Sequence, residues 1–118
     1  MSTAWRVRLA ELAEQDLLSI TLWTVQNFGA HQAEVYAETL SLAIEALHGG
    51  PEILGATARE DIGPGIRTLH VARQGRKARH FVVFRAAAEQ TIDVLRVLHD
   101  SMDLARHLPS ANDPTHPH

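Results

Sequence analysis

Two apolar runs separated by a short polar spacer dominate residues 79–107, and they constrain the fold more than any other part of this 118-residue chain. Residues 81–84 (FVVF) and 92–98 (IDVLRVL) are rich in β-branched and aromatic side chains, which pack well in a sheet. Because so few polar residues join the runs, we predict two adjacent antiparallel strands. Residues 99–103 (HDSMD) follow directly. A rigid sheet would hold these polar side chains at the surface, so they form the first candidate functional site.

The residues before these runs change from strand periodicity to helical periodicity. Residues 5–9 (WRVRL) alternate apolar and basic side chains, which predicts a short edge strand. Apolar residues then recur every three or four positions from about residue 10 to 28 and again from 33 to 47. Gly29 separates the two segments, and a glycine pair followed by a proline at residues 49–51 stops the second. So short a joint predicts an antiparallel helix hairpin.

Strands are predicted in the second half of the chain. Residues 49–65, which are rich in glycine and proline, predict an ordered surface loop. An antiparallel meander of three strands is expected at residues 66–73, 78–86 and 92–98. Ser101 is an N-cap candidate for a short C-terminal helical segment that runs to His107. Helices followed by strands predict an α+β fold with the helices on one face of the sheet.

The length and composition predict one domain at residues 1–108 and a disordered polar tail at residues 109–118. Since 45% of the chain is hydrophobic, it can bury a single core. The absence of cysteine excludes disulfides, cysteine-bound zinc and thiol catalysis. No uncharged apolar run is long enough to span a membrane, so we expect a cytoplasmic protein without a membrane partner.

Charge is distributed unevenly along the chain. No lysine or arginine occurs between Leu9 and Ala58, whereas all the charged residues of that segment are acidic. Basic residues then predominate from Arg59 to Arg85. Such asymmetry can steer a charged partner to one face, although two ordinary solvated faces would give the same pattern.

The polar residues after the last strand do not form a recognisable metal site or nucleophile. His99, Asp103 and His107 lie four residues apart, as ligands on one face of a helix do. His99 closes a predicted strand, however, so the spacing is not helical, and we predict no metal and no other cofactor. Ser101 lacks the glycine elbow of a serine nucleophile, and no glycine-rich phosphate loop is present. We therefore predict no catalytic residue.

Basic residues on the predicted sheet suggest RNA cleavage as an alternative, because they could hold phosphates. These residues are Arg67, His70, Arg73, His80 and Arg85. They are spread over both faces of alternating strands, and Phe81 and Phe84 are better explained as core residues than as platforms for bases. Direct binding of nucleic acid is therefore not expected.

Several short strings of residues occur in a characteristic order between residues 5 and 108. The first helix holds residues 13–20 in the pattern A-x-x-D-L-x-x-I, and the second holds Ala33-x-x-Tyr36 with Leu40. The loop contributes Pro51 and Leu54-Gly55. The strands contribute Gly65-x-Arg67, residues 80–85 (HFVVFR) and residues 92–99 (IDVLRVLH), and Met102-Asp103 follows them. In this order the strings resemble toxins of the RelE/ParE superfamily, and within it the ParE branch of plasmid-stabilisation toxins.

The resemblance implies the toxin of a type II toxin–antitoxin module, neutralised by a ParD-like antitoxin that folds onto the helix hairpin and sheet. ParE-like toxins are associated with inhibition of DNA gyrase by binding, whereas RelE-like relatives cleave messenger RNA on the ribosome. Here Asp100 and Ser101 stand where a RelE-like enzyme has a catalytic arginine, and Phe81 stands where another sheet arginine is expected. This departure favours the ParE function. The alternatives are a RelE-like ribosome-dependent endoribonuclease and a decayed toxin that only binds its antitoxin.

The apolar stripe of the first helix is wider than one neighbour requires, and an uncovered apolar strip indicates a protein partner. A basic amphipathic segment of the antitoxin would find both charge and apolar surface on this acidic hairpin. For antitoxin binding we predict Leu18, Leu22, Trp23, Val25 and Tyr36. For target binding we predict Arg67, Arg85, Arg96, His99, Asp103 and Arg106. Arg96 is alternatively a structural partner of Asp103 or Asp93.

Overall fold

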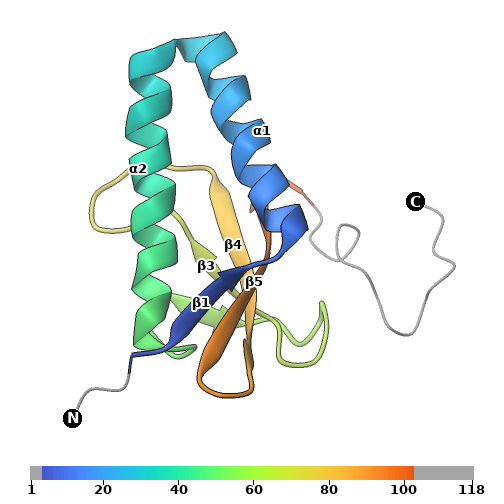
Figure 1. Cartoon of the computed structure of the whole chain (residues 1–118). Helices are drawn as coiled ribbons and strands as arrows, with labels where there is room; N and C mark the ends of the chain where they lie inside the picture. The colour runs from blue at the N-terminus through green and yellow to red at the C-terminus, as the bar shows by residue number, and fades with distance from the viewer. Residues whose placement is uncertain (1–3, 103–118) are drawn as a thin grey trace, which may run out of the picture.

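The computed structural model describes residues 4–102, in which two helices lie on one face of a five-stranded sheet (Figure 1). Strand β1 (Arg6–Leu9) is followed by helices α1 (Glu11–Phe28) and α2 (Ala30–Ala46) and the 3-10 helix η1 (Leu47–Gly49). Strands β2 (Ala56–Ala58), β3 (Arg67–His70), β4 (His80–Ala87) and β5 (Thr91–His99) complete the fold. The sheet order is β1-β5-β4-β3-β2, in which β1 is parallel to β5 and the other neighbours are antiparallel. The predicted α+β class is confirmed.

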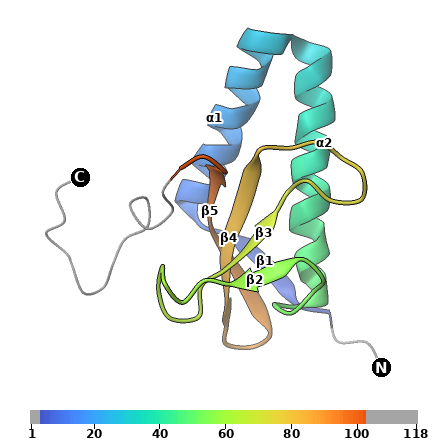
Figure 2. The same cartoon turned by 180° about the vertical axis from the view of Figure 1, so that it is seen from behind.

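The structure corrects the predicted strands in detail. β1 lies at an edge of the sheet, as predicted. The segment 49–65, predicted to be a loop throughout, contains β2, so the meander has four strands instead of three (Figure 2). The sequence gives little sign of β2, because residues 56–58 (ATA) are too few to show an apolar alternation. The predicted C-terminal helical segment and the tail fall largely outside the described residues.

A single residue, Gly29, joins α1 to α2. Its N–H donates to the carbonyl of Val25 over 2.9 Å, and its own carbonyl accepts from the N–H of Ala33 over 3.1 Å. Gly29 therefore closes one helix and opens the next. It does so at a φ of +92°, which glycine adopts without the steric cost that other residues incur. The end of the hairpin that contains Gly29 extends beyond the strands in both views of the fold (Figures 1 and 2).

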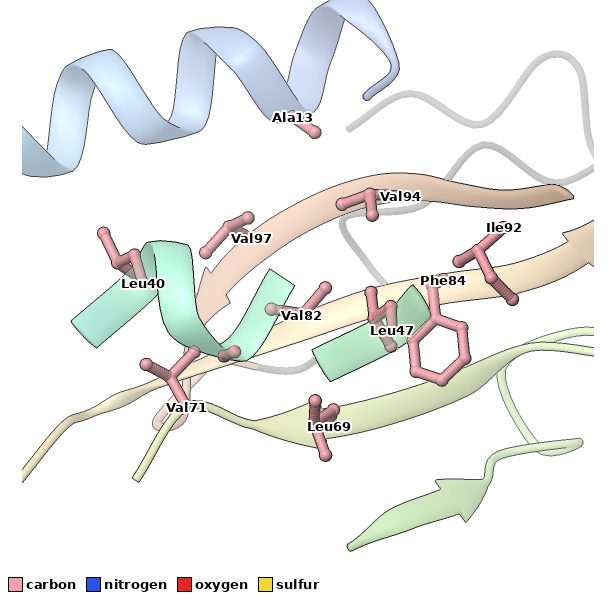
Figure 3. Packing of buried hydrophobic residues seen from close by; sticks show 11 residues of the cluster. Ala13, Leu40, Leu47, Leu69, Val71, Val82, Phe84, Ile92, Val94 and Val97 are labelled. Carbon is pink, nitrogen blue, oxygen red and sulfur yellow. The ribbon is translucent and has the colours of Figure 1, made fainter. Parts of the chain in front are cut away.

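A hydrophobic core fills the space between the helix hairpin and the sheet (Figure 3). Ala13 of α1 and Leu40 of α2 face the sheet, where Phe84 and Val94 are fully buried. A smaller cluster consists of Val83 of β4, Leu98 of β5 and Ile66, which directly precedes β3. Since the central strands are buried on both faces, the two apolar runs are nearly continuous in the sequence.

Asp16 of α1 ties the hairpin to β5 at a place where β5 is paired with β4 on one side and has no neighbouring strand on the β1 side. β1 pairs with β5 only as far as Val94. Just beyond, the Asp16 carboxylate accepts hydrogen bonds from the guanidinium of Arg96 over 2.8 and 3.0 Å and from the N–H of Val97 over 2.9 Å. The hydrogen bond to Asp16 raises the pKa of Arg96 above its ordinary value. Arg96 thus has the structural role that we considered for it, with a partner that the sequence did not reveal.

Replacing Asp16 with alanine should lower the free energy of unfolding by about 2–3 kcal/mol, because the half-buried guanidinium of Arg96 loses two hydrogen bonds and the N–H of Val97 loses its acceptor. Urea unfolding followed by circular dichroism measures this change. Arg8→Met is the matched control, since Arg8 forms a more exposed ion pair with Asp93 at 2.8 Å. This control should change the free energy of unfolding much less than Asp16→Ala does, because exposed ion pairs contribute little to stability. Equal losses in the two variants would contradict the anchoring role of Asp16.

Candidate functional site

An open groove of about 740 Å³ lies where the helix hairpin extends past the sheet. The second half of α1 and the first half of α2 form its walls, and the ends of β4 and β5 form its floor. It is lined by Ser19, Ile20, Trp23, Thr24, Phe28, Gln32, Tyr36, Arg79, His80 and His99. Most of the lining surface is apolar, which suits a ligand that buries apolar side chains.

Trp23 and Phe28 form an exposed aromatic wall of the groove. Their side chains are 56% and 63% exposed, and their rings meet edge to face with centroids 5.6 Å apart. α1 extends beyond the sheet, so side chains near its C-terminal end have no strand to pack against. Exposed aromatic side chains grouped in this way are typical of surfaces that bind other proteins.

The floor of the groove contains a hydrogen bond between helix and sheet. The Tyr36 hydroxyl lies 2.7 Å from Nδ1 of His80 and accepts a hydrogen bond from the backbone N–H of Arg79 over 3.0 Å. The hydroxyl hydrogen is therefore available to donate to Nδ1, which assigns the ring proton of neutral His80 to Nε2. Burial and, secondly, the charge of nearby His99 lower the pKa of His80 to about 4, so that His80 is neutral at pH 7. Burial also raises the pKa of Tyr36.

Asp100 forms a charged cluster at the end of the sheet beside the groove. Its carboxylate lies 3.1 Å from Nε2 of His70 and 3.3 Å from Nε of Arg79. The hydrogen bond with His70 foremost, and then Arg79, holds the pKa of Asp100 below its ordinary value. A carboxylate so placed supplies no positive charge to a phosphoryl transfer at this strand end.

The residues predicted for antitoxin binding lie on two different surfaces. Trp23 and Tyr36 line the groove. Leu18, Leu22 and Val25 recur at four and three residues on the opposite side of α1 from buried Ala13 and Thr24, and they are 72%, 58% and 41% exposed. Phe28 belongs to the aromatic wall, although its helical spacing suggested a core residue. Phe28 is the last residue of α1 and precedes Gly29, and this position at the end of the hairpin is the sequence feature that indicates exposure.

The residues predicted for target binding are not gathered in one place. Arg67 donates to the carbonyl of Pro51 over 2.6 Å, and Arg96 is held by Asp16. Arg85 is exposed on β4, five residues from His80 and thus about 17 Å along the strand. His99 lies at the groove. Asp103 and Arg106 fall outside the described residues.

Seven of the ten lining residues are absent from our predicted binding residues, and Arg79 and His80 are the two basic residues among them. His80 had been considered only as a ligand of phosphates, and Arg79 only as one of several solvated basic residues. Arg79 directly precedes β4 and His80 begins it, and residues at the start of a strand show no sequence spacing that marks a binding site. Their place in the groove depends on the contact between His80 and Tyr36, which lie 44 residues apart in the sequence.

Within residues 4–102, no three histidine, aspartate or glutamate side chains are grouped so that they could hold a metal ion. The helices of the same part of the chain are too short or too polar to cross a membrane. The chemistry that the groove offers consists of aromatic surface, an arginine and two imidazoles.

Comparison with known proteins links this geometry to one family. The family described as "ParE toxin of type II toxin-antitoxin system, parDE" matches residues 7–104. Toxin ParE1 of Mycobacterium tuberculosis is 36% identical over 103 residues, which are 87% of this chain and 97% of that protein. Toxin ParE1 of Caulobacter vibrioides is 30% identical over 101 residues, which are 86% of this chain and 95% of that protein.

Two solved structures share the fold. A chain of the chromosomal ParDE system from P. aeruginosa matches with a TM-score of 0.65 and 21% identity, over 83% of this chain and 98% of that one. A chain of the toxin–antitoxin complex RelBE2 from Mycobacterium tuberculosis matches with a TM-score of 0.55 and 20% identity, over 84% of this chain and 94% of that one.

The depressed pKa of His80 predicts loss of stability in mild acid. The unfolded chain binds a proton at His80 near pH 6.5, and the folded chain binds it only near pH 4. The free energy of unfolding should therefore fall as the pH decreases through this window, by on the order of 2 kcal/mol for this group. Urea unfolding between pH 4 and pH 7 measures the slope. His80→Gln should flatten it, whereas His31→Gln, at an exposed position of α2, should not. A slope that survives in His80→Gln would assign the effect to another group.

Proposed function

Since the chain belongs to the family of ParE toxins of type II toxin–antitoxin systems, we propose that a ParD-like antitoxin holds it inactive and that the released toxin inhibits DNA gyrase by binding. The single observation that carries the antitoxin half of this proposal is the open groove with its exposed aromatic wall. A folded domain that leaves Trp23 and Phe28 uncovered has apolar surface to bury against a partner.

The groove suits an antitoxin segment that folds on binding. Its walls belong to two antiparallel helices, and such grooves accept a helical or extended segment with apolar anchors. The outer stripe of Leu18, Leu22 and Val25 provides further apolar surface on the other side of α1. A single segment that reached both surfaces would pass around the exposed end of the hairpin.

Action by binding agrees with the chemistry at the end of the sheet. The candidate residues for the target are His99 and the exposed Arg85, together with Asp103 and Arg106 further along the chain. Asp100 already accepts hydrogen bonds from His70 and Arg79, so these groups are engaged with a carboxylate and not arranged around a phosphate. Ribosome-dependent cleavage of messenger RNA and a decayed toxin remain as outcomes of the tests below.

Trp23→Glu should reduce recovery of the antitoxin at least tenfold when tagged toxin is co-expressed with the antitoxin encoded beside it and the complex is purified. The glutamate removes the indole surface that the partner would bury and adds a charge that must be desolvated on binding. Leu54→Glu is the matched control, because Leu54 is 91% exposed in the loop before β2, and it should retain the antitoxin. Leu22→Glu tests the outer stripe separately. Full recovery with Trp23→Glu would exclude the groove as the main site.

The purified toxin should block supercoiling of relaxed plasmid by DNA gyrase, and added antitoxin should restore it. Arg85→Glu combined with His99→Ala should weaken inhibition at least fivefold, because both change exposed polar groups that we assign to the target. Arg8→Met serves as the control. Intact supercoiling together with cut messenger RNA on ribosomes would support the endoribonuclease instead. Normal growth of cells that express soluble toxin alone would leave only antitoxin binding.

A further inference from the structure

We propose that the groove contains a carboxylate-binding subsite formed by Arg79 and His99, so that the antitoxin segment seated there presents an acidic side chain beside its apolar anchors. This inference rests on the proposed function, because it specifies the chemistry of the same partner. The net charge of the acidic hairpin alone would predict a wholly basic antitoxin segment. The proposed subsite predicts instead that one position of this segment is acidic.

The charge of the groove is opposite to that of the helices which form it. The residues of α1 and α2 with a permanent charge are all acidic. None of those acids lines the groove, and the one permanent charge among its lining residues is the guanidinium of Arg79. An anionic group in the groove therefore meets the guanidinium of Arg79, although the two helices that form the walls are acidic, and a lysine or arginine of the partner would meet like charge there.

Arg79 has hydrogen-bonding capacity left for a ligand. Its side chain is 70% exposed, and its contacts with Asp100 run through Nε at 3.3 Å. The two terminal nitrogens make no hydrogen bond to any residue in the range 4–102. Those nitrogens form the planar fork that binds a carboxylate through two parallel hydrogen bonds.

The two imidazoles of the floor add N–H donors. Nδ1 of His99 accepts a hydrogen bond from the backbone N–H of Ser101 over 3.1 Å, which assigns the proton of the neutral ring to Nε2. His80 has its proton on Nε2 for the corresponding reason, since Tyr36 occupies its Nδ1. The rings of His80 and His99 meet edge to face with centroids 5.2 Å apart. The polar part of the floor is thus built mainly of donors, which match a carboxylate.

Asp100 does not occupy the subsite. It is absent from the groove lining, and its oxygens already accept from His70 and from Nε of Arg79. Asp100 accepts from Nε of Arg79 and lies 3.6 Å from Nδ1 of His99, so it orients both side chains and partly offsets the charge of the arginine. We therefore expect the subsite to act through directional hydrogen bonds more than through long-range electrostatic attraction. It would then select an acidic side chain at one position of the antitoxin segment.

The matched probes are N-acetyltryptophan and N-acetyltryptophanamide, which share an indole and differ in the charge of one group. NMR titration of the ¹⁵N-labelled toxin at low ionic strength, read at the indole N–H of Trp23, gives their dissociation constants. The acid should bind at least fivefold more tightly than the amide. Arg79→Gln should abolish this difference, and Arg79→Lys should reduce it. Arg8→Gln, at an exposed position of β1 outside the groove, should preserve it. Urea unfolding of each variant checks that the fold is retained.

Equal binding of the acid and the amide, binding of neither, or an advantage of the acid that survives Arg79→Gln would overturn the carboxylate subsite. These results are separable from failure of the proposed function. If Trp23→Glu loses the antitoxin while the acid and the amide bind equally, the groove remains the antitoxin site and only its preference for an acid is lost. If Trp23→Glu retains the antitoxin but N-acetyltryptophan still binds through Arg79, the subsite binds a small carboxylate ligand. That result would overturn the antitoxin as its occupant.

Discussion

The carboxylate of Asp16 determines where the groove lies, because it fixes α1 on the sheet. It satisfies a backbone N–H of β5 at the point where β1 has ended, and it pairs with Arg96 in the same place. A helix is stiff over this length, so fixing one part of α1 also fixes the direction of the remainder. α1 begins beside Val94, in the middle of β5, because the N–H of Ala10 donates to the carbonyl of Val94. The 18 residues of α1 span about 27 Å, whereas the five residues of β5 beyond Val94 span about 17 Å. The uncovered end of α1 and its aromatic side chains follow from this offset.

Stability and binding consequently reside in different residues of the same helix. Ala13 and Leu17 belong to the core side, whereas Trp23 and Phe28 contribute exposed surface. Surface residues of this kind can be replaced with little effect on folding, while a core residue cannot. The division allows the toxin domain to fold before it meets its antitoxin. Tyr36 is the exception, since its hydroxyl joins the groove to the strand through His80 and Arg79.

The sequence predicts the fold well where periodicity is long and poorly where geometry arises from distant contacts. The helix hairpin and the two central strands each carry a strong apolar pattern, and all of them were predicted. β2 was not predicted, because three small residues give no pattern and the strand exists only through pairing with β3. In the candidate site, Trp23 is predicted from the over-wide stripe of the first helix and Tyr36 from the stripe of the second, and both line the groove. Arg79 and the pairing of Asp16 with Arg96 could not, because each depends on residues at least 21 positions apart.

The single-residue joint at Gly29 has a consequence for how a partner binds. With no flexible loop between them, the two walls of the groove cannot open or close independently, and the cleft is preorganised. A disordered segment that enters it must lose its own conformational entropy, but the toxin loses little. Longer joints would shift part of this entropic cost onto the toxin and weaken the complex without altering a single contact. This one-residue connection thus acts on affinity although Gly29 itself does not line the groove.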